Sequence, residues 1–105
     1  IGYGDQDGYQ RTPAEARDAA HANDKALVDG GATMGIARSP TLVRNPEGRG
    51  VETRPGPFMS SPMPLAGFAI IEAADLDDAV RMVAGSPCAV AHGVIEVWPL
   101  DEAAP

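Results

Sequence analysis

The hydrophobic positions of this chain recur with a helical period in some stretches and alternate in others, which divides the sequence into helices and strands. In residues 13–29, alanines and Leu27 share one stripe at helical spacing, which predicts a helix whose buried face is mostly alanine. We expect Thr12 to start this helix in a capping box with Glu15, and Gly30-Gly31 to end it. An alanine face packs closely but adds little bulk to a core.

Residues 65–73 form the clearest strand, because their alternating positions are apolar on both faces, which predicts a central place in a sheet. Asp75 then caps a second helix, which stops at Gly85-Ser86-Pro87. Residues 93–100 form the last strand, and Pro99 confines its end to a sheet edge or a bulge.

The helical period disappears between residues 32 and 54. Short segments with β-forming residues lie at 33–37, 41–44 and 50–54. Asn45-Pro46-Glu47-Gly48 has proline and glycine at the positions that a turn favours, so we predict a hairpin here. Residues 55–64 contain four prolines and are expected to form a loop over the sheet or along its edge.

The predicted elements run strand, helix, two or three strands, helix, strand. This order is typical of an α+β sandwich with an antiparallel sheet and two helices on one face. A chain of 105 residues with 44% hydrophobic and 22% charged residues suits a single domain over residues 1–105. With only 5% aromatic residues the core is thin, so dimerisation would add buried surface. Residues 1–5 have the pattern of the end of a strand, and we expect the strand to continue upstream of Ile1.

The net charge of −7 disfavours binding to nucleic acid and to anionic membranes, because both interactions need Lys and Arg to replace counterions. A small neutral molecule or a protein is the better partner. The single cysteine, Cys88, excludes an internal disulfide, and we expect a buried, inert thiol in a reducing compartment. No run reaches the about 18 apolar residues of a membrane span and no leader is apparent, so we expect a cytoplasmic protein.

The basic residues of this acidic chain are concentrated in one stretch. It contains Arg38, Arg44, Arg49 and Arg54, with Glu47 and Glu52 as the carboxylates among them. Two interpretations are open, a site for an anion or carboxylate and a hairpin whose arginines face water.

One segment carries a family resemblance. Gly56-Pro57-Phe58 precedes a strand that begins Leu65-Ala66-Gly67-Phe68, and the helix after it opens Asp75-Leu76-Asp77-Asp78-Ala79. The segment resembles the YCII-related family, also called DGPF proteins, and the similarity extends over nearly the whole chain. The resemblance implies a ferredoxin-like sandwich that pairs sheet to sheet into a dimeric α+β barrel, with a pocket between sheet and helices. For the broader family it also implies a proposed enzymatic role built on a histidine and an aspartate.

The chain departs from the family pattern around its signature. Pro55 stands where the family has the aspartate of Asp-Gly-Pro-Phe, so a carboxylate role at that position does not carry over. Met59-Ser60-Ser61-Pro62-Met63-Pro64 follows where relatives place charged residues, which predicts an apolar and stiff segment over the pocket.

Two histidines are the candidate catalytic residues. His21 has Asp18 and Asp24 at helical spacing, and a carboxylate can orient an imidazole that acts as a general base. His92 follows Ala89-Val90-Ala91, and such apolar surroundings favour a neutral ring that binds a ligand. A solvent-exposed helix histidine and a loop histidine bonded to backbone carbonyls are the alternative interpretations.

We therefore carry two hypotheses. The first is a dimeric YCII-like barrel that binds a small organic ligand between sheet and helices and performs proton transfer with His21 or His92. The second is a non-catalytic binding or dimerisation module, accessory to a regulatory partner. No metal site and no cofactor are predicted. The residues predicted to bind the ligand are Asp5, Arg38, Arg54, Phe58 and Phe68.

Overall fold

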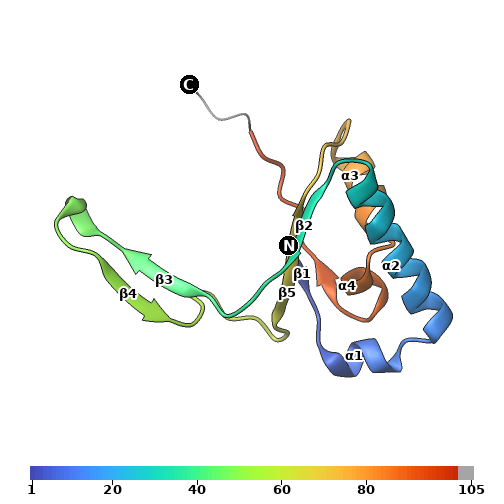
Figure 1. Ribbon diagram of the computed structural model, residues 1–105, viewed down its shortest axis with the longest axis horizontal. Coiled ribbons are helices and arrows are strands. Elements are labelled where there is room, and N and C mark those ends of the chain that lie inside the picture. Colours follow the sequence, from blue (N-terminus) through green and yellow to red (C-terminus); the bar gives the residue numbers. More distant parts are fainter. Residues whose placement is uncertain (102–105) are drawn as a thin grey trace.

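A computed structural model describes residues 1–101 of the chain, so the last four residues of the predicted domain lie outside the described part. Two antiparallel sheets are present, one of four strands in the order β2-β5-β1-β6 and one of two strands, β3 and β4 (Figure 1). The elements are β1 (Gly2–Tyr3), α1 (Gln6–Arg11), α2 (Ala14–Asp29), β2 (Thr33–Ile36), β3 (Thr41–Arg44), η1 (Pro46–Gly48), β4 (Glu52–Pro55), β5 (Leu65–Ile70), α3 (Leu76–Val83), α4 (Pro87–Val90) and β6 (Val94–Ile95).

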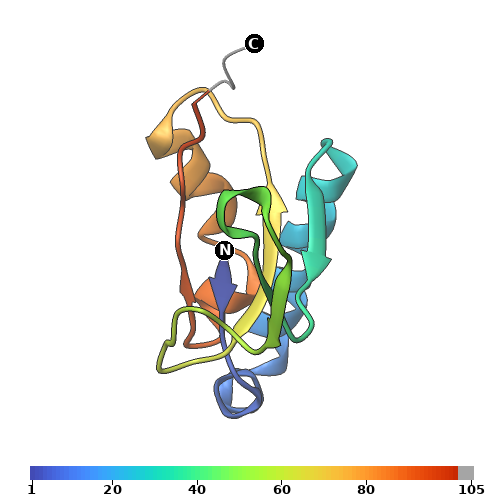
Figure 2. The same ribbon diagram turned by 90° about the vertical axis from the view of Figure 1, so that its left-hand side faces the viewer.

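The α+β class and the antiparallel sheet are confirmed. Helices α2, α3 and α4 lie on one side of the four-stranded sheet, and the two-stranded sheet projects on the other side (Figures 1 and 2). The Asn23 side chain ties this helical layer together, because its amide donates to the Met82 carbonyl and to Ser86 Oγ, both at 3.1 Å.

The central position predicted for residues 65–73 is confirmed, since β5 pairs with β1 on one side and β2 on the other. The strand is shorter than predicted and ends at Ile70. The final strand is also shorter, because β6 pairs with β1 only at two residues, Val94 and Ile95. The Glu96 amide still donates to the Ile1 carbonyl at 2.8 Å. Residues 97–100 of the predicted strand 93–100 lie beyond that bond and pair with no strand of the described chain.

The predicted capping box at Thr12 is wrong. Thr12 is buried and its hydroxyl donates to the Gly8 carbonyl at 2.8 Å, so it closes the preceding helix, while Pro13 occupies the N-cap of α2 without a side-chain bond. That preceding helix, α1, was not predicted, because six residues that include Gly8 show no helical period. The end of α2 at Gly30-Gly31 is as predicted, with Gly31 at φ 110°.

The second long helix begins as predicted, since the Asp75 carboxylate accepts from the Asp78 amide at 2.8 Å. It ends at Val83 with Ala84 as its C-cap, and the Ser86-Pro87 pair then starts the unpredicted short helix α4. Proline suits this first helical position because its missing N–H has no partner there in any helix.

The predicted hairpin is confirmed. We call residues 41–55, which comprise β3, η1 and β4, the arm. Thr41 pairs with Pro55 and Arg44 with Glu52 across the ladder. At the base of the arm the Gly56 amide donates to the Pro40 carbonyl at 3.1 Å. Gly56 has a φ of 103°, a backbone conformation that favours glycine. The first residue of the Gly-Pro-Phe signature therefore closes the base of the arm.

The core is as thin as the composition predicts. Within the described residues the buried hydrophobic side chains are Ala20, Ala79 and Ala91, and none of the larger ones is fully buried. The solvent-accessible surface is 8174 Å², whereas a compact monomer of this size exposes about 5,600 Å². The radius of gyration is 16.1 Å, against about 13 Å for a compact domain of this length. The projecting arm and the exposed apolar side chains of the sheet both add to this surface (Figure 1).

Candidate functional site

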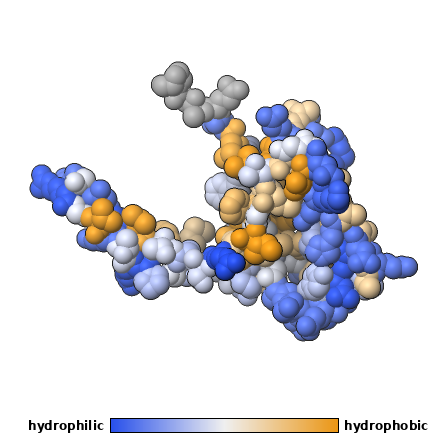
Figure 3. All heavy atoms as spheres, in the orientation of Figure 1, coloured by the Kyte–Doolittle hydropathy of each residue, from blue (hydrophilic) through white to orange (hydrophobic). Residues whose placement is uncertain are grey.

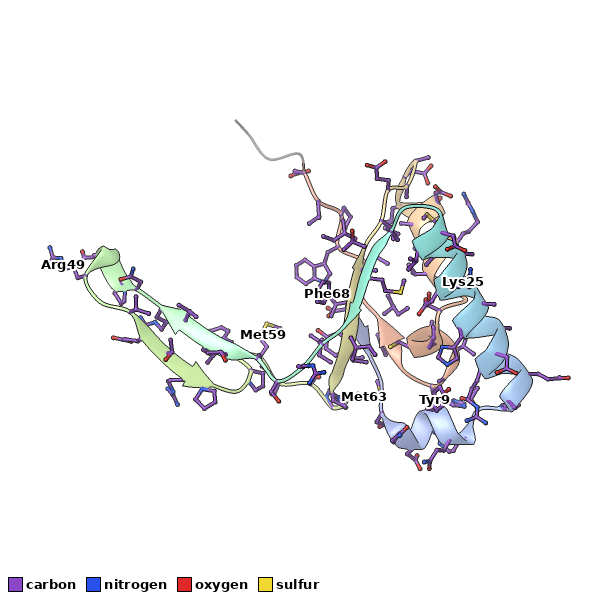
Figure 4. All side chains as sticks on the ribbon, viewed as in Figure 1. Tyr9, Lys25, Arg49, Met59, Met63 and Phe68 are labelled. Atoms are coloured by element: carbon purple, nitrogen blue, oxygen red, sulfur yellow. The ribbon has the colours of Figure 1, made fainter. Side chains whose placement is uncertain are left out.

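The sheet face opposite the helices is apolar and uncovered. Strand alternation turns Ala69 towards the helices and its neighbours Phe68 and Ile70 to the other side, where they are 51% and 58% exposed. We call this surface the open face, and its exposed apolar side chains are Ile1, Phe68, Ile70, Val94 and Trp98. Hydrophobic residues gather on the side of the body that faces the arm, and Phe68 lies there (Figures 3 and 4).

A groove of about 1520 Å³ joins the open face to the gap between sheet and helices. Its walls include Phe68, Ile70 and Trp98 from the open face, and Met34, Leu27 and Ile95 from the layer between sheet and helices. A smaller cavity of about 490 Å³ lies between the C-terminal end of α2 and the strands β2 and β5. From α2 the groove is lined by His21, Asp24, Leu27 and Val28.

Polar groups reach this groove from α2. His21 and Asp24 are part of its lining, and the Cys88 thiol lies beside them. Oδ1 of Asp24 is buried and has no hydrogen-bond partner among the described residues. Burial of Cys88 raises the pKa of its thiol, and the nearby Asp24 charge raises it further, which agrees with an inert thiol. Buried oxygens usually accept a hydrogen bond, so a ligand in the groove with an N–H or O–H group could supply the donor that Oδ1 of Asp24 lacks.

His21 contacts a residue that the sequence did not pair with it. The Tyr9 hydroxyl lies 2.9 Å from Nε2 of His21, and the two rings meet edge to face with centroids 5.9 Å apart. The guanidinium of Arg17 lies over the Tyr9 ring at 5.0 Å, and Tyr9 projects from α1 towards α2 (Figure 4). The expected hydrogen bond from His21 to Asp18 or Asp24 is not formed in the described structure. The sequence feature that indicates this contact is Asp5, because an N-cap at Asp5 starts α1 and places Tyr9 one helical turn further along the chain.

His92 lies elsewhere and is not enclosed. It is exposed and has a left-handed backbone with φ at 64°. A Cβ added to Gly8 would lie 3.5 Å from the His92 Cβ, so His92 borders α1, and it takes no part in lining the groove. The apolar surroundings expected from its sequence neighbours are therefore absent around the ring.

The structure separates most of the predicted ligand-binding residues. Phe68 lines the groove, as His21 does. Asp5 instead caps α1 by accepting from the Gly8 amide at 2.8 Å. Arg54 lies in the arm, while Arg38 and Phe58 lie at its base, where Phe58 is 88% exposed.

A second polar pair lies on the open face itself. Tyr3 and Glu96 are neighbours there, and the hydrogen bond to the Glu96 carboxylate raises the pKa of the Tyr3 phenol, with burial and the negative charge acting in the same direction. Glu96 is also part of the groove wall. The open face thus has the Glu96 carboxylate beside its apolar side chains.

None of the helices within residues 1–101 has the length and apolarity needed to cross a membrane. The same residues contain no group of three or more histidine, cysteine or acidic side chains arranged to hold a metal ion. No family model matches the chain, and no curated protein or solved structure is significantly similar to it.

Proposed function

We propose that this chain is the subunit of a YCII-like homodimer in which two open faces pack together and each subunit binds a small organic molecule in its groove. The strand order β6-β1-β5-β2, with the helices on one face, supports a ferredoxin-like sandwich of this type. The observation that carries the proposal is the apolar open face, which continues into a groove lined by Asp24, whose Oδ1 is buried and has no hydrogen-bond partner among the described residues.

The exposed area argues that a second copy covers the open face. The surface exceeds that of a compact monomer by about 2,500 Å², whereas a standard interface buries about 800 Å² on each partner. Exposed contiguous apolar surface of this kind is typical of an interface. A two-fold arrangement uses the same patch on both copies, so the open face alone is sufficient.

The groove defines the class of ligand. Its apolar walls favour a small, mainly hydrocarbon molecule, and Asp24 requires that the molecule carry a hydrogen-bond donor such as a hydroxyl or an amine. His21 is the candidate base at the groove wall, where Tyr9 holds Nε2 at 2.9 Å and orients the ring. In this scheme Nε2–H of His21 donates to the Tyr9 hydroxyl oxygen, which leaves Nδ1 unprotonated. Nδ1 takes a proton from the carbon next to a ligand carbonyl and returns it to the product.

A non-catalytic binding module is the second candidate. It is favoured by Pro55 in place of the family's aspartate, and by the absence of a carboxylate bonded to His21 in residues 1–101. Both candidates share the dimer and the groove, and they differ only in whether a proton moves.

The dimer is tested by light scattering at micromolar concentration. Wild type is expected to have twice the mass of the chain, and Phe68→Asp the mass of one chain. Val80→Asp is the matched control, because Val80 is 48% exposed on α3, similar to Phe68, but is not part of the groove wall. A monomeric wild type, or a Phe68→Asp variant that stays dimeric, would contradict the proposed interface.

Ligand binding and proton transfer are tested separately. Small aromatic hydroxyketones are screened by ligand-detected NMR. Binding is expected to weaken at least tenfold in Asp24→Ala. The variant is expected to stay folded, because it loses a buried oxygen that has no hydrogen-bond partner among the described residues. For a bound ketone, exchange of α-protons with D₂O is then followed. Exchange that wild type accelerates and His21→Ala abolishes supports catalysis. Binding without accelerated exchange supports the non-catalytic module, and no binding by any compound contradicts the ligand site.

A further inference from the structure

The arm makes almost all of its contacts with itself. Its two strands pair along residues 41–44 and 52–55, and it projects from the body on the side of the open face (Figures 1 and 2). Val43 and Val51 in the arm are 66% and 68% exposed. An isolated two-stranded hairpin with exposed valines is only marginally stable in water, so a covering partner would stabilise it.

The arm together with residues 38–40 at its base is basic, whereas the rest of the chain is acidic. Residues 38–54 carry four arginines and two glutamates, which leaves four basic and thirteen acidic residues for the rest of the chain. Within the arm Arg44 pairs with Glu52 at 3.5 Å and Arg49 with Glu47 at 3.8 Å, both at the surface. Arg38 and Arg54 have no carboxylate within 4.0 Å among the described residues. Two free cations therefore lie where the arm leaves the body.

The arm projects at an angle to the open face, so a second copy packed on the open face would also contact the arm. The arm and the open face form two sides of an angle, and Met59 lies near its corner (Figure 4). A body stacked on the open face would fill this angle and meet the side of the arm. The arm is a hairpin over residues 41–55 with roughly seven residues on each side, which at about 3.3 Å per residue lets it extend about 23 Å along a neighbouring body.

We propose that the arm of each subunit clasps the acidic body of the other subunit. This inference rests on the proposed sheet-to-sheet dimer and adds a second, reciprocal contact to it. The valines of the arm are covered by the partner, and Arg38 and Arg54 form ion pairs with its carboxylates. Complementary charge of this kind accelerates association and selects the correct partner.

The clasp predicts a charge-sensitive dimer. The double variant Arg38→Glu/Arg54→Glu is expected to weaken dimerisation at least tenfold at 50 mM salt, measured by sedimentation, with a smaller effect at 500 mM salt because exposed charges are screened. Arg11→Glu/Lys25→Glu makes the same change in net charge on exposed side chains of α1 and α2 and is expected to leave the dissociation constant within twofold.

Cross-linking locates the arm directly. In a Cys88→Ser background, Arg49→Cys places a thiol at the tip of the arm, and a photoreactive maleimide is attached to it (Figure 4). Mixed isotope-labelled and unlabelled subunits are expected to show cross-links from one arm to the helices or the sheet of the other copy. Cross-links only within one chain, or between two arms, overturn the clasp.

The outcomes separate the clasp from the dimer. If Phe68→Asp dissociates the dimer while both arm experiments show no effect, only the clasp is wrong. If wild type is a monomer, the dimer and the clasp fall together. If the arm variants weaken the dimer and the cross-links reach the other body, the clasp is established.

Discussion

Ile70→Ala provides a quantitative test of the open face as an interface. Ile70 is 58% exposed in the single chain, so most of its side chain still has apolar surface to lose when a partner covers it. The substitution removes three carbons, and at about 0.8 kcal/mol for each buried methylene the exposed share amounts to roughly 1.4 kcal/mol per subunit. A symmetric dimer contains the residue twice, so dimerisation loses about 2.8 kcal/mol, or roughly 100-fold in the dissociation constant.

The assay is thermal unfolding over a wide range of protein concentration, combined with sedimentation equilibrium. Because the dimer is favoured by mass action, the wild-type midpoint is expected to rise with concentration, and the Ile70→Ala curve should be shifted towards higher concentration by about 100-fold. Val80→Ala on α3 is the control, with a similar exposure of 48% and no place on the open face. Equal dissociation constants for wild type and Ile70→Ala would refute the reasoning.

Three further results are expected. Gly67→Ala should destabilise the chain by about 1–3 kcal/mol, because the added Cβ would lie 2.5 Å from the Gly35 carbonyl oxygen. Gly35→Ala is the control, since a Cβ added there would have no neighbouring atom of the described residues within 4 Å, and urea unfolding compares the stability of the two variants. The hydrogen bond from the Ala74 amide is the main cause that lowers the pKa of the Asp78 carboxyl below its ordinary value of 3.8. The stability that Asp78 contributes to the fold is therefore present above pH 3.8 and is lost as the pH falls through the lowered pKa. Asp78→Asn should flatten this acid dependence of unfolding. The pKa of Cys88 is raised by burial, so iodoacetamide should alkylate it more slowly at pH 8.5 than the same thiol in the urea-unfolded chain; equal rates would show that the thiol is not shielded.

The candidate site was predictable only where a local pattern produces it. His21 and Phe68 were selected from the sequence, and both line the groove. Helical spacing places Asp24 next to His21, but the burial of its oxygen depends on α2 packing beside α4, which no local pattern indicates. Tyr9 was missed as the partner of His21, because the contact requires α1, a helix too short to show a period. The sequence predicts Asp5 as a ligand residue, and in the structure its carboxylate caps that helix.

By itself the sequence determined the α+β class, the span of α2, the Asp75 cap and the hairpin, because these depend on residues close together in the chain. Even the thin alanine core follows from composition. Only the tertiary structure decided that β1 lies between β5 and β6, that an apolar sheet face stays uncovered, and that the arm leaves the body on that same side. These features depend on contacts between distant segments, whose free energy comes from surfaces that no local pattern specifies. The proposed second copy follows from these surfaces, because one chain of this composition has too few large side chains to cover them.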